Sequence, residues 1–150
     1  MKEVIIRPGT KHDTQQVFNL IYELAVFEKA PEQVTNTVEQ MLIDGYGDEP
    51  CYKVIVAEVE NKIVGIALTF IKYSTWKGKG VFLEDLIVTE NMRGHKIGKL
   101  LFEEVISYSK SINAKQLHWQ VLDWNTPAID FYKKYNAEIS GEWLNCKMYF

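Results

Sequence analysis

The sequence predicts a mixed α/β domain in which helices surround one central sheet. Short apolar segments typical of strands occur between segments whose apolar residues have the spacing of a helix. Composition agrees, because 47% hydrophobic and 25% charged residues are values of a globular protein. A length of 150 residues favours one domain over residues 1–150, large enough to bury a substantial core.

A short strand and a helix are expected at the start of the chain. The strand covers residues 4–7 and stops at Pro8. Asp13 or Thr14 can cap a helix that continues to about Glu28. The apolar face of this helix consists of Val17, Leu20, Ile21, Leu24 and Ala25.

A second helix and three strands are expected next. The helix begins at Thr35 or Thr37 and ends at Gly45. The segments with strand character are residues 52–58, 63–72 and 81–88. Because only the tight turns 60–62 and 76–80 separate them, we expect these strands to be antiparallel.

The last third of the chain is expected to alternate helices and strands. A helix ends near Ile112, and a strand follows over residues 116–121. Another helix starts at Asn125 and reaches Tyr135, with Pro127 in its first turn, where the missing N–H costs nothing. One or two final strands are predicted at Ile139 and over residues 143–150.

The turn over residues 93–99, between the third of these strands and the following helix, is the most informative segment. The first amides of a helix have no partners within it, and the helix dipole adds partial positive charge there. Gly94 and Gly98 allow a ligand to approach the backbone, while Arg93, Lys96 and Lys99 add full positive charge. This combination predicts a phosphate site. An ordinary polar loop before a helix is the alternative at this point.

Composition and motifs argue against several other classes. A net charge of −3 argues against a nucleic-acid-binding protein, and no apolar run reaches membrane-spanning length. Two cysteines are no disulfide framework, and the N-terminus lacks the apolar core of a signal peptide, so we expect a cytoplasmic protein. His12, His95 and His118 do not have the spacing of metal ligands, and no metal is expected.

Three segments together carry a family pattern. They are the strand at 83–88 followed by Arg93-Gly94-His95-Lys96-Ile97-Gly98, the segment 123–137, and the fragments 23–28 and 73–78. Together they resemble the GCN5-related N-acetyltransferase (GNAT) family: the first is similar to its acetyl-CoA motif, the second to its Asn-x-x-Ala-x-x-x-Tyr segment. The remaining fragments resemble its spermidine/spermine and thialysine N-acetyltransferase branch.

The resemblance implies the acyl-CoA N-acyltransferase fold, a mostly antiparallel sheet with one splayed strand and helices on both faces. It implies that acetyl-CoA donates an acetyl group directly to a primary amine. The implied acceptor is a small cation: a diamine, a polyamine or a thialysine- or lysine-like amino acid. By the same resemblance we expect a homodimer, and charge, residue spacing and the lack of long apolar runs predict no nucleic-acid partner, no metal and no membrane partner.

The resemblance also assigns residues. Cofactor contacts are implied for Leu86, Ile87, Val88, Arg93, Gly94, His95, Lys96, Ile97, Gly98, Lys99, Asn125, Pro127 and Ala128. Glu84 is the implied base that accepts the proton of the amine, and Tyr132 the acid that protonates the leaving thiolate. The implied acceptor pocket consists of Phe27, Glu28, Trp76, Glu84 and Asp85.

Two departures from the family pattern leave alternatives open. Lys96 stands where the motif usually has its middle glycine, and Asn136 replaces the glycine after the tyrosine helix. The acceptor could instead be an amino sugar, an antibiotic or a peptide N-terminus. A non-catalytic module that only binds CoA is the alternative from a different class.

Overall fold

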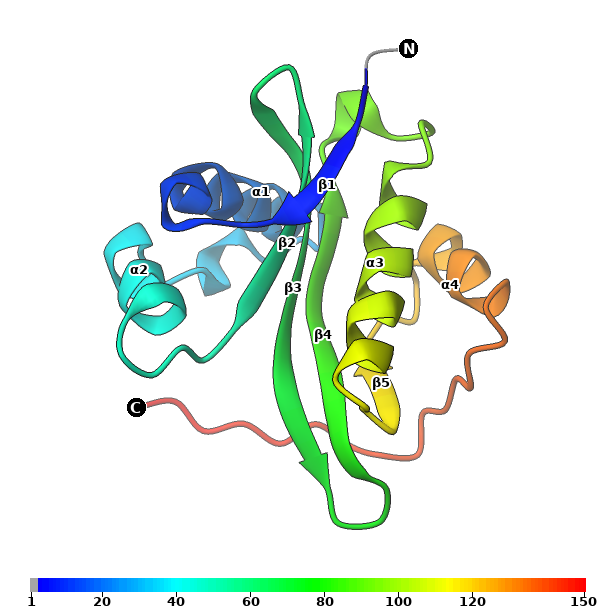
Figure 1. Ribbon diagram of the computed structural model, residues 1–150. Coiled ribbons are helices and arrows are strands. Elements are labelled where there is room, and N and C mark those ends of the chain that lie inside the picture. The colour runs from blue at the N-terminus through cyan, green and yellow to red at the C-terminus, as the bar shows by residue number, and fades with distance from the viewer. Residues whose placement is uncertain (1–2) are drawn as a thin grey trace. The chain divides into compact units, whose positions relative to one another are not determined.

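The computed structural model describes residues 3–150 (Figure 1). The chain divides into two compact units, Met1–Gln120 and Val121–Phe150. The first unit contains β1 (Ile5–Pro8), α1 (Thr14–Phe27), α2 (Val38–Tyr46), β2 (Lys53–Val59), β3 (Lys62–Ser74), β4 (Gly78–Val88), α3 (Ile97–Ser111) and β5 (Gln116–Trp119). The second contains α4 (Thr126–Lys133). Strands and helices therefore follow the order that the sequence predicts up to α4.

The first unit is built on a five-stranded sheet with the order β1-β2-β3-β4-β5. Neighbouring strands are antiparallel from β1 to β4, and β5 alone is parallel to its neighbour β4. Figure 1 shows α1 and α2 on one face of this sheet and α3 on the other. The predicted mostly antiparallel sheet with helices on both faces is confirmed.

Buried apolar side chains join α1 and α2 to the sheet. This core consists of Val17, Leu20, Met41, Val54, Val56, Ile63, Ile66, Leu68 and Ile87. Val17 and Leu20, the members from α1, belong to the predicted apolar face of that helix. Thr37 begins α2, because its side-chain oxygen accepts the backbone N–H of Gln40 at 3.1 Å.

A β-bulge lies in the middle of β4. Leu68 pairs with Asp85 while its neighbour Thr69 pairs with Leu83, so Glu84 is the extra residue of β4. The pairing of β4 with β5 ends at Leu83, opposite Trp119. Beyond the bulge, residues 84–88 have no pairing partner in β5, which ends at Trp119, as expected for the splayed strand that the family resemblance implies.

The second unit corrects one prediction. The one or two strands predicted at Ile139 and over residues 143–150 are absent from the described part of this unit, which has no regular structure after α4. The large apolar side chains of residues 143–150 are exposed, at 90% for Leu144 and 83% for Trp143. Strand-like composition alone was insufficient, because a strand needs a neighbouring edge to satisfy its backbone groups.

Candidate active site

The turn before α3 leaves backbone amides unused. Lys96 is the N-cap of α3, and its side chain makes no capping hydrogen bond to the first turn. The N–H of Leu100 is the first to bond back into the helix, to Lys96 O at 3.1 Å. The first-turn amides of Ile97, Gly98 and Lys99 consequently point toward the place where the sequence predicts a phosphate.

The backbone of this turn has the shape of a glycine-rich loop even where the glycine is missing. Gly94 has φ +81°, and a Cβ placed there would meet no atom within 4 Å. Lys96 has φ 64° and ψ 10°, the left-handed conformation that a side chain disfavours. Lys96 therefore adopts the conformation for which the family motif uses glycine. Asn136, the other departure, also has a positive φ, 55°.

Three carboxylates of the first unit interact electrostatically. Burial, together with the charges of Glu84 and Glu28, raises the pKa of Asp85 to about 7. Partial burial and the charge of Glu84 raise the pKa of Glu28. Asp85 pairs with Leu68 on the face of the sheet covered by α1, next to the bulged Glu84. The structure thus brings together the three acidic residues of the predicted acceptor pocket.

The two aromatic residues of the predicted pocket lie in different places. Phe27 ends α1, and the guanidinium carbon of Arg93 lies 5.2 Å from the centre of its ring. Trp76 is 87% exposed at the tip of the β3–β4 hairpin. The part of β4 from Gly78 to Glu84 spans about 20 Å, because a strand advances ~3.3 Å per residue. Phe27 therefore adjoins the predicted site, and Trp76 stands apart from the carboxylates within this unit.

The second unit carries the remaining predicted residues. Asn125 caps α4, because its side-chain oxygen accepts the N–H of Ala128 at 3.4 Å, and Pro127 lies in the first turn. Tyr132 is buried, and burial raises the pKa of its hydroxyl to about 12. Its ring lies 5.3 Å from that of Phe131. The Tyr132 hydroxyl therefore holds its proton at neutral pH.

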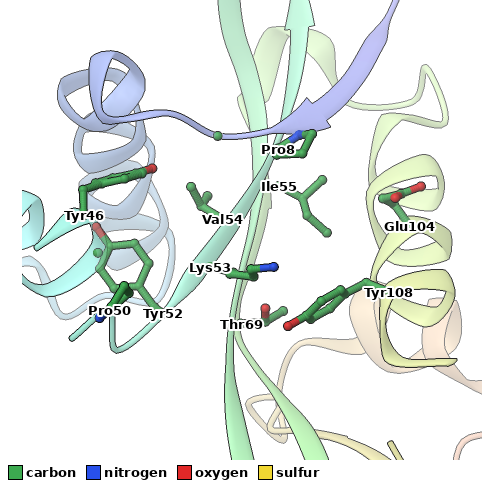
Figure 2. Close-up of a pocket in the computed structure, with 12 residues that line it drawn as sticks. Pro8, Tyr46, Pro50, Tyr52, Lys53, Val54, Ile55, Thr69, Glu104 and Tyr108 are labelled. Carbon is green, nitrogen blue, oxygen red and sulfur yellow. The ribbon is translucent and has the colours of Figure 1, made fainter. Parts of the chain in front are cut away.

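A cavity of about 300 Å³ lies elsewhere on the first unit. Figure 2 shows Tyr46 and Tyr52 on one side of it and Glu104 and Tyr108 of α3 on the other. Tyr52 is fixed by a hydrogen bond of 2.6 Å from its hydroxyl to Met41 O. The residues that line the cavity include none of the predicted site residues, so it is a separate feature.

Comparison with known proteins identifies the family. The model of the acetyltransferase (GNAT) family matches residues 15–137. The chain belongs to the GNAT family. It is therefore an N-acetyltransferase.

Individual relatives agree with this assignment. A thialysine N-epsilon-acetyltransferase from Bos taurus is 36% identical over 92% of this chain and 86% of its own length. The enzyme of that name from Caenorhabditis elegans is 30% identical over 99% of this chain and 93% of its own. An aminoglycoside N-acetyltransferase solved in complex with CoA has the same fold, with a TM-score of 0.78 at 16% identity, covering 99% of this chain and 96% of that one.

Two features are absent from the residues that the structure describes. Within residues 3–150, no three or more His, Cys, Asp and Glu side chains are grouped as metal ligands. None of the helices in this range has the length and apolar composition of a membrane-spanning helix.

Sequence reasoning missed one residue beside the site. Glu23 of α1 hydrogen-bonds to the turn that precedes the predicted phosphate loop, through Thr89 and Glu90. Nothing local in the sequence identifies this role, because the partners are more than sixty residues apart.

Proposed function

We propose that this GNAT enzyme transfers the acetyl group of acetyl-CoA to a primary amine of a small cationic acceptor. The acceptor class is a diamine, a polyamine or a thialysine- or lysine-like amino acid. The observation that carries the proposal is the group of three carboxylates, Glu28, Glu84 and Asp85, in which burial and then the repulsion of the other two charges raise the pKa of Asp85. A bound ammonium relieves that repulsion, whereas a neutral or anionic acceptor does not. The names of the thialysine N-epsilon-acetyltransferase relatives support the same class.

The residues around α3 fit the diphosphate of acetyl-CoA. Backbone N–H groups from Gly94 to Lys99, including those of His95 and Ile97, can donate hydrogen bonds to phosphate oxygens. The side chains of Lys96 and Lys99 add positive charge. Arg93 begins this loop. The backbone of Leu86, Ile87 and Val88 pairs with the pantetheine arm like an added strand, because β5 no longer occupies that side of β4. Asn125, with Pro127 and Ala128, contributes contacts from the start of α4.

The chemistry requires one base and one acid. An alkyl ammonium with a pKa of ~10.4 must lose a proton before its nitrogen can attack. Glu84 accepts that proton, directly or through a water molecule, and the amine nitrogen then forms a bond to the thioester carbonyl carbon. As the carbon–sulfur bond breaks, the Tyr132 hydroxyl gives its proton to the thiolate of CoA. The nitrogen loses its second proton as it becomes an amide nitrogen, and this proton restores the Tyr132 hydroxyl. Asp85 and Glu28 hold the cationic acceptor, and Phe27 contributes aromatic surface to it. Trp76 is too far from these carboxylates within the same unit to take part.

The protein is proposed to act as a cytoplasmic homodimer, with residues 1–150 forming one domain. Two exposed free thiols, Cys51 and Cys146, suit a reducing compartment. Large exposed apolar side chains in the second unit suit an interface between subunits.

The acceptor class is tested by measuring release of the CoA thiol from acetyl-CoA across a panel of amines. The panel contains diamines, polyamines, thialysine, lysine, amino sugars, aminoglycosides and a peptide with a free N-terminus. The proposal predicts the highest kcat/KM for an acceptor among the diamines, polyamines and lysine analogues. A clear preference for an amino sugar, an aminoglycoside or a peptide would assign this enzyme to another acceptor class.

A further inference from the structure

The turn between β4 and α3 is attached to α1 by one carboxylate. Thr89 donates its hydroxyl to Glu23 Oε2 at 2.9 Å, and the backbone N–H of Glu90 donates to Glu23 Oε1 at 2.9 Å. The Nη2 atom of Arg93 lies 3.8 Å from Glu23 Oε1. Both oxygens of Glu23 therefore bind the short segment that leads into the predicted phosphate loop.

Arg93 strengthens this attachment from the other end of the turn. Its Nε donates to Val88 O at 3.0 Å, and its guanidinium carbon lies 5.2 Å from the centre of the Phe27 ring. Glu23 and Phe27 are four residues apart on α1 and so lie on the same side of the helix. The guanidinium is held by α1 and β4 together, through an ion pair, a hydrogen bond and a cation–π contact.

These contacts supplement the backbone hydrogen bond that attaches the segment to β3, from the N–H of Thr89 to Val64 O at 2.9 Å. Glu90 and Arg93 are exposed, and Thr89 is only half-buried. Within the segment itself, the bonds of Met92 N–H to Thr89 O and of Arg93 N–H to Glu90 O form only a short 3-10 turn. The position of this turn determines where the loop that starts at Gly94 lies, and therefore in which direction the amides of residues 94–99 point.

We propose that Glu23 is a positioning residue for the cofactor: it sets the phosphate loop in place before the cofactor binds, without touching the reacting atoms. The inference rests on the proposed use of acetyl-CoA. A loop that is already ordered loses less conformational entropy on binding, so removal of Glu23 weakens CoA affinity. We expect the chemical step at saturating substrates to be unaffected, because the hydrogen bonds of Glu23 come from Thr89 and Glu90 and its ion pair is with Arg93.

The variants are chosen to break the contacts in separate ways. In Glu23→Gln the amide NH2 cannot accept a hydrogen bond, so one of the two donors loses its acceptor, and the charge that attracts Arg93 is gone. Thr89→Val removes the hydroxyl donor with little change of shape, and Thr89→Ser retains it. Glu39→Gln on exposed α2 is the control for loss of one negative charge elsewhere.

The experiment combines calorimetric titration with CoA and steady-state kinetics of the full chain. For Glu23→Gln we expect the Kd for CoA and the KM for acetyl-CoA to rise about tenfold, as for loss of one charged hydrogen bond. Thr89→Val follows in the same direction, whereas Thr89→Ser and Glu39→Gln stay near the unaltered protein. The kcat and the KM for the amine remain within about twofold in all four, since a positioning role acts through cofactor binding alone.

Other outcomes decide against the inference. CoA affinity that is unchanged in both Glu23→Gln and Thr89→Val overturns it. A fall in kcat at unchanged CoA affinity overturns it as well, because that pattern places Glu23 in the chemical step. Failure of the unaltered chain to bind CoA contradicts the proposed function itself, and is distinguished by the control titration.

Discussion

At the scale of single residues, the raised pKa of Asp85 makes the stability of the protein depend on pH. Its pKa of about 7 lies above the ordinary value of 3.8, so the folded protein binds more protons than the unfolded chain between these pH values. The free energy of unfolding therefore falls as pH rises through this window. Below the window both states hold the proton, and above it the folded state contains a carboxylate that the unfolded chain would solvate better.

Replacing this carboxylate should stabilise the protein at high pH only. Asp85→Asn is expected to raise the free energy of unfolding at pH 8 by at most about 4 kcal/mol, because a pKa difference of one unit corresponds to ~1.4 kcal/mol. Near pH 4 the two proteins should be nearly equal. Urea denaturation at both pH values measures the difference. An equal effect at both, or a loss of stability at pH 8, contradicts the interpretation of Asp85.

Tyr132 provides the second prediction at this scale. Its hydroxyl retains a proton at neutral pH, since burial raises its pKa to about 12. Tyr132→Phe is expected to lower kcat by about 10²-fold, the size of a general-acid contribution, with little change in the Kd for CoA. Thiol-release kinetics and calorimetry separate the two quantities. Turnover that is unchanged in the variant removes this role from Tyr132.

At the scale of elements, the residue that precedes α3 has an unfavourable backbone conformation. Lys96 adopts φ 64°, which costs a residue with a side chain ~1–2 kcal/mol relative to glycine. Lys96→Gly removes this cost, but part of the stability gained is lost again because glycine also makes the unfolded chain more flexible.

We expect Lys96→Gly to raise the free energy of unfolding by about 0.5–1 kcal/mol, the net of these two effects. Lys110→Gly, in the last turn of α3, is the matched control and should lose stability by less than about 1 kcal/mol, the cost of glycine in a helix interior. Urea denaturation of both variants measures the changes. A Lys96→Gly protein that is less stable than the unaltered chain contradicts the strain.

At the scale of the whole molecule, the second unit exposes large apolar side chains. Trp143, Leu144 and Met148 are at least 78% exposed, more than monomeric proteins usually leave together in water. We therefore expect sedimentation at micromolar concentration to give twice the chain mass of 17.4 kDa. A single species with the mass of one chain contradicts the proposed homodimer.

The sequence predicted the features that depend on local pattern. Apolar spacing, capping residues and glycines were sufficient to predict the helices α1 and α2, the antiparallel strands β2 to β4 and the turn before α3. Long-range features were not accessible in this way. The bulge at Glu84 is visible only once β3 and β4 are paired, and the contacts of Glu23 join residues on different elements. The strand prediction for residues 143–150 was wrong because their apolar pattern does not reveal whether the edge of a neighbouring strand is available for pairing.

The central claim is that main-chain amides of residues 94–99 bind the diphosphate of the cofactor. Its most direct test is a titration of the isotope-labelled protein with CoA, followed through the backbone amide resonances by NMR. The account predicts the largest shifts at residues 94–99, with smaller ones at residues 86–88. If CoA leaves the resonances of residues 94–99 unmoved, the proposed cofactor site is contradicted.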